Sequence, residues 1–300
     1  MNGTENTIAW DMSRGSITLS RNESDERIIM MRKGFMEAFF QEIEEVEGKN
    51  VLTMTMRALM KKLGAAEDLL TSPDFATLSS FENDYMLPLG YANGDVPRAI
   101  AVNGGDRELQ AFGDTSFTLE SLEMLQTLKE VTADILTVRG ADAVFNAVAR
   151  RGGRAVALQV MKNYNWTEID AAMSSMDSSL SATFPLFGWG NVQVITNKDE
   201  NGMYLFYARC DNTFESHNRT ADSPVCVLFQ RYLEGIADVL FTELSDSSCE
   251  SREVKCRAVG DEYCAFAIKE KPRGSGALDW DAVADEWRAL DQHAAAPTAA

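Results

Sequence analysis

Two cysteines near the carboxyl end of the chain constrain its folding more than any other feature. Cys256 and Cys264 stand on either side of the turn signal Gly260-Asp261, within two short runs in which apolar and polar residues alternate. If a β-hairpin turns at Gly260, the two cysteines are cross-strand neighbours with Cα atoms ~4.5–5.5 Å apart. That separation suits two thiolates on one tetrahedral zinc ion, and it equally suits a disulfide. The spacing alone leaves both open.

The beginning of the sequence and the cysteine count favour a metal over a disulfide. The first residues contain no basic start followed by an apolar stretch, and no apolar run approaches the ~20 residues that cross a bilayer. We therefore expect a soluble, cytoplasmic protein without a membrane segment, in a compartment that keeps thiols reduced. Five cysteines is an odd number, which argues against a full disulfide framework. Cys210 and Cys249 are expected to be small buried apolar residues.

The charge of the chain excludes some partners. Its 300 residues carry a formal net charge of −18, and the acidic residues are spread along the sequence. Nucleic-acid phosphates bind Lys and Arg, and anionic membrane surfaces repel acidic chains, so neither is an expected partner. A hydrophobic content of 45% is ordinary for a globular protein and is enough to form one or two cores.

The apolar spacing of the first half predicts mainly helices. Glycines at 48, 64, 140 and 152–153 are predicted to end them, and one interpretation of this punctuation is a degenerate internal repeat. Residues 70–116 are rich in turn signals and form a mixed stretch with a candidate strand over 98–102. The helices are predicted over residues 25–46, 50–63, 118–138, 141–151 and 155–164.

The second half changes character. A proline at 224 starts a long apolar helix over 225–244. After a linker at 272–276, a short acidic helix carries one apolar stripe, which more often packs on its own domain than on a partner. Its members are Trp280, Val283, Trp287 and Leu290. Strands are predicted over residues 191–197, 203–210, 250–258 and 263–269.

Several short motifs of this half occur together in one order. They are Asn212-Thr-Phe-Glu-Ser, Ser223-Pro-Val-Cys226, Tyr232-Leu-Glu-Gly235, Glu253-Val-Lys-Cys256, Gly260-Asp261 and Tyr263-Cys264-Ala-Phe266-Ala-Ile268. In this order and spacing the stretch resembles the 4-vinyl-reductase domain of bacteriochlorophyll biosynthesis proteins, of the sensor halves of aromatic-responsive transcription activators and of small archaeal hydrocarbon-binding proteins. The resemblance implies an α+β fold like the small TRAPP-complex subunits, with an antiparallel sheet and flanking helices around an apolar cavity.

The same resemblance implies a structural zinc site, because each of the four zinc-binding positions of the sensor members has a counterpart in this sequence. Glu253 lies three residues before Cys256, so strand alternation sends the two side chains to opposite faces unless a β-bulge intervenes. A site with four protein ligands has no open position for water or substrate, so the metal would be structural. The implied ligands are Cys226, Glu253, Cys256 and Cys264. Nearby cations that could offset their charge are Arg252, Lys255 and Arg257.

Aromatic residues gather around the strands that precede the long helix predicted over 225–244. Most aromatic residues in such a module form ordinary core, and the functional interpretation is a pocket for an apolar or aromatic small molecule. Trp189 is favoured because the flanking glycines 188 and 190 allow close backbone approach. Tyr207 and Tyr232 offer hydroxyl groups. The candidate ligand-binding residues are Trp189, Phe187, Phe206, Tyr207, Phe214 and Tyr232.

Signatures of catalysis are scarce. The chain has neither a dinucleotide-binding glycine motif nor a phosphate-binding loop, and its two histidines, His217 and His293, lie in a polar loop and near the tail. We therefore expect a zinc-stabilised binding protein for an apolar or aromatic molecule, acting as a sensor or a carrier. Alternatives are an enzyme or accessory factor in vinyl reduction of a tetrapyrrole, and a TRAPP-like scaffold.

Three regions follow from these patterns. Residues 1–116 form a helix-rich amino-terminal region, which could be a repeat or a dimerisation element. Residues 117–270 form the 4-vinyl-reductase-like domain, and residues 271–300 comprise the linker, the short helix and a disordered tail. A homodimer is expected, with a partner protein bound through the amino-terminal region or the carboxy-terminal helix.

Overall fold

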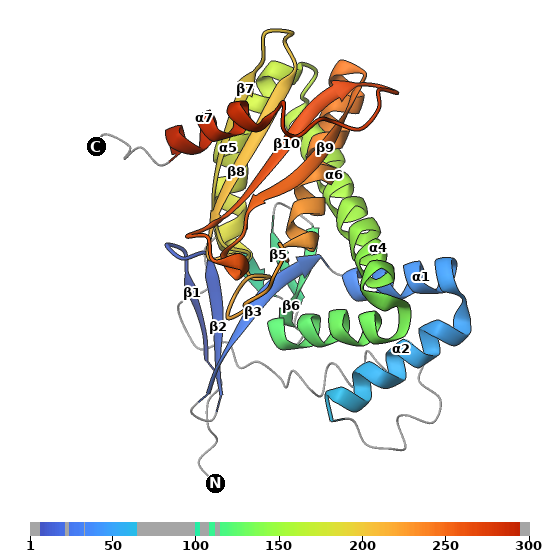
Figure 1. The fold of residues 1–300 in the computed structure, drawn as a ribbon. Helices are drawn as coiled ribbons and strands as arrows, with labels where there is room; N and C mark the ends of the chain where they lie inside the picture. Colours follow the sequence, from blue (N-terminus) through green and yellow to red (C-terminus); the bar gives the residue numbers. More distant parts are fainter. Residues whose placement is uncertain are drawn as a thin grey trace. The chain divides into compact units, whose positions relative to one another are not determined.

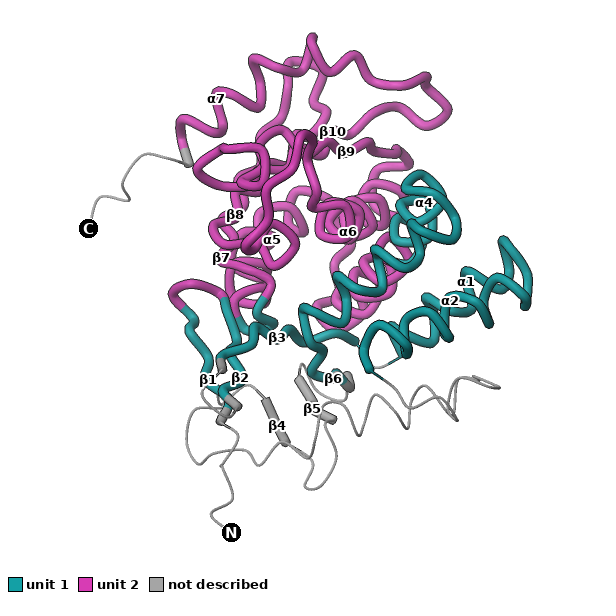
Figure 2. Tube along the Cα trace, turned by 60° about the horizontal axis from the view of Figure 1, so that its bottom comes forward, with its two compact units in different colours: residues 1–12, 16–148, 186–188 teal, residues 13–15, 149–185, 189–300 magenta. Residues whose placement is uncertain are grey.

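The fold is mixed α/β, with antiparallel sheets and flanking helices, as expected (Figure 1). A computed structural model describes residues 7–21, 24–32, 34–64, 100–102, 108–111 and 115–294. The chain divides into two compact units (Figure 2). Unit 1 takes residues 1–12, 16–148 and 186–188, and unit 2 takes residues 13–15, 149–185 and 189–300. This division falls at residues 148–149, inside a helix.

Unit 1 contains a six-stranded antiparallel sheet in addition to helices of the amino-terminal region. The strand order is β1-β2-β3-β6-β5-β4. The strands are β1 (Thr7–Asp11), β2 (Ser16–Arg21), β3 (Ser24–Arg32), β4 (Ile100–Val102), β5 (Glu108–Ala111) and β6 (Thr115–Ser121). β4 confirms the candidate strand over 98–102, while residues 65–99 and 295–300 lie outside the described residues.

The helix predicted over 25–46 is a strand followed by a helix. Four consecutive residues of β3, Ile28 to Met31, are all buried, which is the pattern of a strand covered on both faces. A short continuous apolar run fits a strand and a helix equally, so periodicity could not separate them. α1 (Phe35–Glu47) begins only after Gly34, whose φ of 85° is left-handed.

Two further helices complete unit 1. α2 (Lys49–Lys62) confirms the helix predicted over 50–63. α4 (Leu122–Tyr164) begins later than predicted, because Thr115–Ser121 pair as β6 with β3 and β5. Within unit 1 the ring of Phe39 packs 4.7 Å from that of Phe145, which joins α1 to α4.

α4 consists of two helices joined at a kink, so the helix end predicted near Gly140 is confirmed, whereas the second helix continues through Gly152 and Gly153. Its backbone leaves helical geometry only at Thr137, with φ 73° and ψ 162°. Gly153 lies inside the helix, and the position requires glycine because a Cβ there would overlap the carbonyl oxygen of Tyr232. In the same way, a Cβ at Gly235 would overlap the carbonyl oxygen of Arg150. These glycines therefore mark a backbone-to-backbone approach of two helices rather than a helix end.

Unit 2 contains a four-stranded antiparallel sheet in the order β7-β8-β10-β9. All four strands confirm the predicted ones, and so does the long helix α6 (Val227–Ser245). α5 (Ile169–Leu186) has no counterpart among the predicted elements. The strands are β7 (Asn191–Lys198), β8 (Tyr204–Asp211), β9 (Ser247–Lys255) and β10 (Cys264–Pro272).

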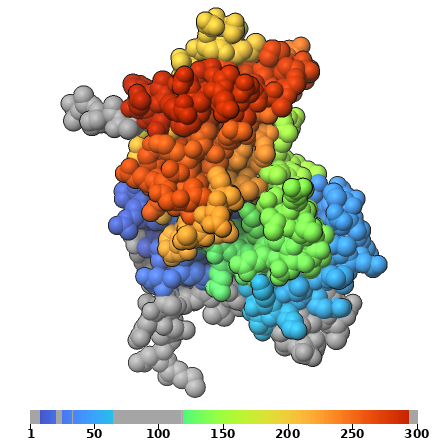
Figure 3. Space-filling model, viewed as in Figure 1, coloured from blue at the N-terminus to red at the C-terminus, as the bar shows by residue number. Residues whose placement is uncertain are grey.

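Helices cover both faces of this sheet. On one face α6 contacts β10 through the rings of Phe229 and Phe266, whose centroids are 5.0 Å apart. On the other face lies α7 (Ala284–Ala294), which the space-filling view shows as part of a continuous band across unit 2 (Figure 3). Its apolar stripe is packed against the sheet, which confirms that this helix packs on its own unit. The residues buried together are Leu205, Tyr207, Tyr263, Ala265, Ala267, Trp280, Val283 and Leu290.

A search for membrane-spanning helices gives a negative answer. Within the described ranges, each helix is too short or too polar to cross a lipid bilayer.

Candidate metal centre and apolar cavity

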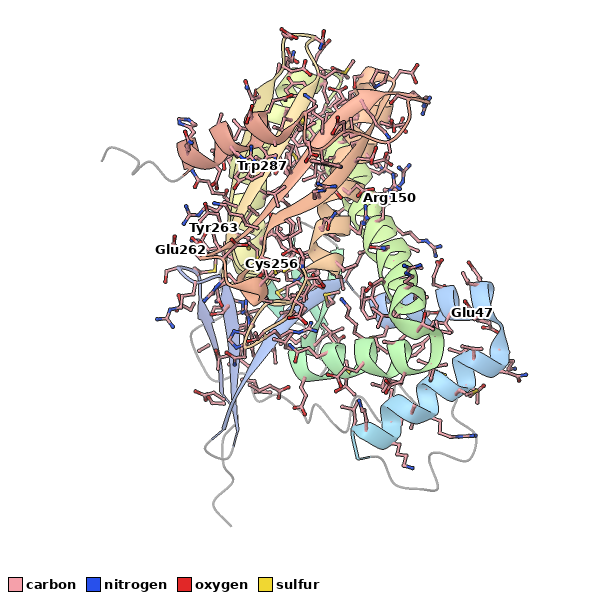
Figure 4. All side chains as sticks on the ribbon, in the orientation of Figure 1. Glu47, Arg150, Cys256, Glu262, Tyr263 and Trp287 are labelled. Carbon is pink, nitrogen blue, oxygen red and sulfur yellow. The ribbon has the colours of Figure 1, made fainter. Side chains whose placement is uncertain are left out.

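Three cysteine side chains and one glutamate side chain converge at one end of the β9–β10 ribbon. Each offers one ligand atom, and these four atoms all lie within 4.8 Å of one another. All four residues are buried. They are Cys226, Glu253, Cys256 and Cys264, the set that the resemblance implies as zinc ligands. Cys256 is labelled in Figure 4.

Local structure explains how residues so far apart in sequence meet. Cys226 is the residue before the first turn of α6, and Cys264 is the first residue of β10. Cys256 directly follows β9 and precedes the 3₁₀ turn η2 (Arg257–Val259). Gly260 then closes that turn with a left-handed φ of 108°. The ribbon thus returns two cysteines to the start of α6.

A β-bulge brings Glu253 to the same side as Cys256, as the ligand set requires. Ala265 pairs with Lys255, but its neighbour Phe266 pairs with Glu253. β9 therefore holds one extra residue, Val254, opposite a single step of β10. Without that bulge, strand alternation would send the carboxylate away from the sulfur atoms.

The sulfur geometry favours a metal site over a disulfide. The Sγ atoms of Cys226 and Cys264 are 3.6 Å apart. A disulfide bond measures ~2.05 Å, whereas two sulfurs bound tetrahedrally at ~2.3 Å from one zinc ion are ~3.8 Å apart. All five cysteines are free thiols and buried, which also agrees with the expected burial of Cys210 and Cys249.

The hydrogen bonding of the Glu253 carboxylate indicates whether the four residues fit a cation. Its Oε2 accepts a hydrogen bond from the backbone N–H of Cys226 at 2.9 Å. Its Oε1 is buried and has no hydrogen-bond partner among the residues that the structure describes. An unpaired carboxylate oxygen costs free energy in the interior, and a metal ion at the centre of the cluster removes that cost. The donor set therefore fits zinc.

The electrostatics of the cluster point the same way. Burial raises the pKa of Cys226 well above its ordinary value, and burial raises the pKa of Glu253 to about 7. Hydrogen bonds from Cys226 and Cys256 lower the pKa of the Cys264 thiol. Without a cation, one thiolate is therefore stabilised by two neighbouring thiols. A divalent cation would let all four groups ionise together.

Cys264 has further hydrogen-bond partners. Thr213 Oγ1 lies 3.1 Å from its Sγ, and the thiol donates to Ser216 Oγ at 3.4 Å. The backbone N–H of Arg257 donates to the same sulfur at 3.4 Å. Such hydrogen bonds stabilise a thiolate and fix its orientation, as expected around a metal ligand.

Glu215 has a role that sequence reasoning missed. Its carboxylate accepts the backbone N–H groups of Leu228 at 3.1 Å and Phe229 at 2.7 Å. These are among the first N–H groups of α6, which have no partner inside the helix. A remote carboxylate therefore caps the helix that begins at Cys226. The sequence gives no local signal, because cap and helix are separated by 13 residues.

Two of the expected counter-charges are directed elsewhere. Lys255 Nζ lies 2.5 Å from Asp291 of α7 and 2.6 Å from the hydroxyl of Tyr263. The guanidinium of Arg252 lies 5.3 Å from the ring centre of Trp280. Both side chains leave the ribbon on the α7 face, so the expectation that they offset the cluster is wrong.

Unit 2 also contains an apolar cavity of about 60 Å³. It lies among the carboxy-terminal part of α4, α5 and α6, and none of the described residues that line it is charged. Half-buried residues form its rim, among them Trp166 and Tyr232. Its buried floor consists of Ala157, Met176, Leu180, Phe184, Ile236 and Leu240.

Of the six candidate ligand residues, Tyr232 lines this cavity. Trp189 is buried behind it, with ring centroids 4.8 Å apart, and Phe214 packs 5.3 Å from Trp189. Gly190 serves a close approach as expected, but to Cys210: a Cβ there would lie 2.6 Å from its Sγ.

The other three candidates lie elsewhere. The Tyr207 hydroxyl donates to Asp291 on the α7 face of the sheet. Phe206 alternates with Tyr207 in β8, so it faces the other side and is fully buried. Phe187 belongs to unit 1, where its ring packs 4.8 Å from that of Phe117.

Sequence reasoning missed most of the cavity because it missed α5. The helical spacing of three and four was present in that segment at Met173, Met176, Leu180 and Phe184. Interleaved serines and a proline near the end obscured it.

The chain shows only distant similarity to known proteins. No protein-family model matches the chain, and no curated protein matches it. The phenol-responsive sensory domain of the transcription activator PoxR matches at 17% identity and TM-score 0.48, covering 64% of this chain and 93% of that one. An H-NOX protein from S. oneidensis in the Fe(II)NO state matches at 9% identity and TM-score 0.39, covering 80% and 99%. An oxygen-binding H-NOX domain related to soluble guanylate cyclases matches at 9% identity and TM-score 0.38, covering 83% and 100%. At these values the function has to be argued from the chain's own residues.

Proposed function

We propose that this chain is a zinc-stabilised binding protein for an apolar or aromatic small molecule, acting as a sensor or as a carrier for a partner protein. One observation carries the proposal: α6 serves both sites. Cys226 lies at its amino end, and Tyr232, Ile236 and Leu240 of the same helix line the cavity.

The zinc ion would be structural. Four protein ligands leave no position for a reacting water, so the metal would fix the start of α6 to the β9–β10 ribbon. Cys226 brings the helix, while Glu253, Cys256 and Cys264 bring the ribbon. Binding would deprotonate the thiols and supply the partner that Glu253 Oε1 lacks.

The ligand would act on the same helix. A cavity of about 60 Å³ is smaller than the ~150 Å³ cavity that holds benzene in an engineered protein. A ring-sized ligand therefore has to displace a wall. Because zinc would hold the amino end of α6, displacement would tilt that helix against the sheet and alter a surface that a second copy or a partner protein recognises.

Two measurements test the proposal together. Native mass spectrometry of protein purified without chelators should show one zinc ion per chain, and it reports retained ligand and oligomeric state at once. Thermal unfolding should shift upward with an apolar or aromatic ligand, because a ligand bound only by the folded state stabilises it. Absence of stoichiometric zinc refutes the metal site, and no shift across a panel of apolar ligands refutes the binding function.

The scaffold alternative is favoured by the size of the cavity. A protein whose helices fill their own core needs no ligand, and a cavity of about 60 Å³ holds only a few water molecules. In that case zinc would be present, but neither retained ligand nor a thermal shift would be found. A tetrapyrrole is several times larger than benzene, so the cavity does not favour the reductase alternative.

A further inference from the structure

The serines of α5 differ in how their hydroxyl groups are bonded. In a helix such hydroxyls commonly donate to the carbonyl one turn back. Ser174, Ser175 and Ser178 do so, donating to the carbonyls of Asp170, Ala171 and Ser175. Ser179 and Thr183, in contrast, both line the cavity. Across the described ranges their hydroxyls have no hydrogen-bond partner.

These two hydroxyls lie on one stripe of the helix. Residues four apart on a helix are neighbours on the same face, with Cβ atoms ~5–6 Å apart. One small polar group of a ligand can therefore reach both Ser179 and Thr183. The floor beneath them is apolar, as the burial of Leu180 and Phe184 shows. The cavity thus combines an apolar floor with a pair of hydroxyls at its rim.

We infer that this cavity selects an uncharged, ring-sized apolar molecule with one hydrogen-bonding substituent, which Ser179 and Thr183 hold. This inference rests on the proposed binding function and specifies its ligand class. An ionised ligand is excluded by desolvation, because no charged side chain lines the cavity to pair with it. A pure hydrocarbon fits the floor but leaves both hydroxyls without a partner.

Trp166 is the side chain at the rim that can move to let such a ring enter the cavity. It is half-buried and lies in the short connection between Tyr164, where α4 ends, and Ile169, where α5 begins. Its ring stacks on that of Tyr164, which is 68% exposed. The exposed Tyr164 ring changes rotamer far more easily than the fully packed floor, so the stacked pair of Tyr164 and Trp166 can move together. Ligand entry past Trp166 therefore leaves Phe184 in place.

The test compares two probes of nearly equal shape. Benzyl alcohol and ethylbenzene differ by a hydroxyl in place of a methyl group. Their dissociation constants are measured by calorimetry or by tryptophan fluorescence on the full chain. The variant is Ser179→Ala combined with Thr183→Val, which removes both hydroxyls at nearly constant volume. The matched control is Ser178→Ala, an exposed residue of the same helix that is bonded back to Ser175.

We expect wild-type protein and the Ser178→Ala control to bind benzyl alcohol more tightly than ethylbenzene. The double variant should lose roughly tenfold in affinity for benzyl alcohol and little for ethylbenzene, as for one or two hydrogen bonds. Trp166→Ala should accelerate association of both probes. Equal preference in wild type and double variant overturns this inference and leaves the binding function standing. No binding of either probe to wild type overturns the inference, and a wider ligand panel then decides the binding function.

Discussion

The Sγ atoms of Cys226 and Cys264 lie 3.6 Å apart, although 38 positions separate them in the sequence. One belongs to the start of α6 and the other to the start of β10. Their distance is that of two ligands on one tetrahedral metal ion rather than of a bonded pair of sulfurs.

Replacing Cys264 should therefore remove the metal and much of the stability. We expect Cys264→Ser to lose zinc by elemental analysis. A site held at 1,000 times its dissociation constant contributes about 4 kcal/mol to the free energy of unfolding, and the variant should lose a comparable amount. Chelation of the wild type should lower its urea midpoint similarly. Cys249→Ala is the control, because Cys249 is a buried thiol outside the cluster. If Cys264→Ser keeps one zinc per chain, the ligand set is wrong.

The neighbouring glycines of α4 should respond oppositely to alanine. A Cβ at Gly153 would overlap the carbonyl oxygen of Tyr232, which belongs to the backbone of α6 and cannot yield without moving that helix. A Cβ at Gly152 would lie 3.6 Å from the Tyr232 ring, an ordinary contact. We expect Gly153→Ala to destabilise by more than about 3 kcal/mol. Gly152→Ala should gain up to about 1 kcal/mol of helix propensity. Urea unfolding measures both, and equal effects would contradict the close helix approach.

That pair also shows where a sequence misleads. A Gly-Gly pair is a good signal for a helix end, because glycine gains most from leaving the helix. Here the packing of α6 against α4 outweighs the low helix propensity of glycine, and this packing becomes visible only from the position of the α6 backbone. The buried run of β3 gave a similar error, since four apolar residues in succession do not show a period.

The cluster of three cysteines and Glu253 was the most predictable part of the molecule, and the cavity was the least predictable part. Thiols and turn residues within one ribbon have a fixed separation, so Cys256 and Cys264 could be placed together from spacing alone. The bulge at Val254 follows from requiring Glu253 on the same side. The cavity, in contrast, forms where three helices fail to fill space, and that depends on side-chain shapes across α4, α5 and α6.

Replacing Thr137 by glycine should stabilise the protein. Its φ of 73° with ψ of 162° is a conformation that only glycine adopts freely, and a β-branched residue there costs about 1–3 kcal/mol. Its Oγ1 accepts the N–H of Gly140 at 3.4 Å, a cap whose replacement by glycine costs only a few tenths of a kcal/mol. We expect Thr137→Gly to raise the free energy of unfolding by about 1 kcal/mol. Thr137→Val, which keeps the branching and loses the cap, should lower it, and a Thr137→Gly variant no more stable than wild type would contradict the strain.

Asp291 should make the docking of α7 depend on pH. It accepts hydrogen bonds from Lys255 and Tyr263, each at 2.5 Å, and from Tyr207. Burial alone would raise the pKa of Asp291, but the hydrogen bonds from Lys255, Tyr207 and Tyr263 outweigh it and hold that pKa below 3.8. A lowered carboxyl pKa contributes stability that is present above the unfolded-state value and is lost as the pH falls through the folded-state value.

Asp291→Asn should therefore cost about 1.5–3 kcal/mol at neutral pH, as for hydrogen bonds to a charged group. The difference from wild type should shrink as the pH falls below about 4, because the wild-type carboxylate is then protonated as well. Urea unfolding of both proteins across this range isolates the effect, since a change in zinc binding is common to both. Asp285→Asn is the control: that side chain is 99% exposed and, within the described part of the chain, pairs with Arg288 alone, so its effect should be small at every pH. A pH-independent penalty for Asp291→Asn would show that packing, rather than the carboxylate's charge, holds α7 on the sheet.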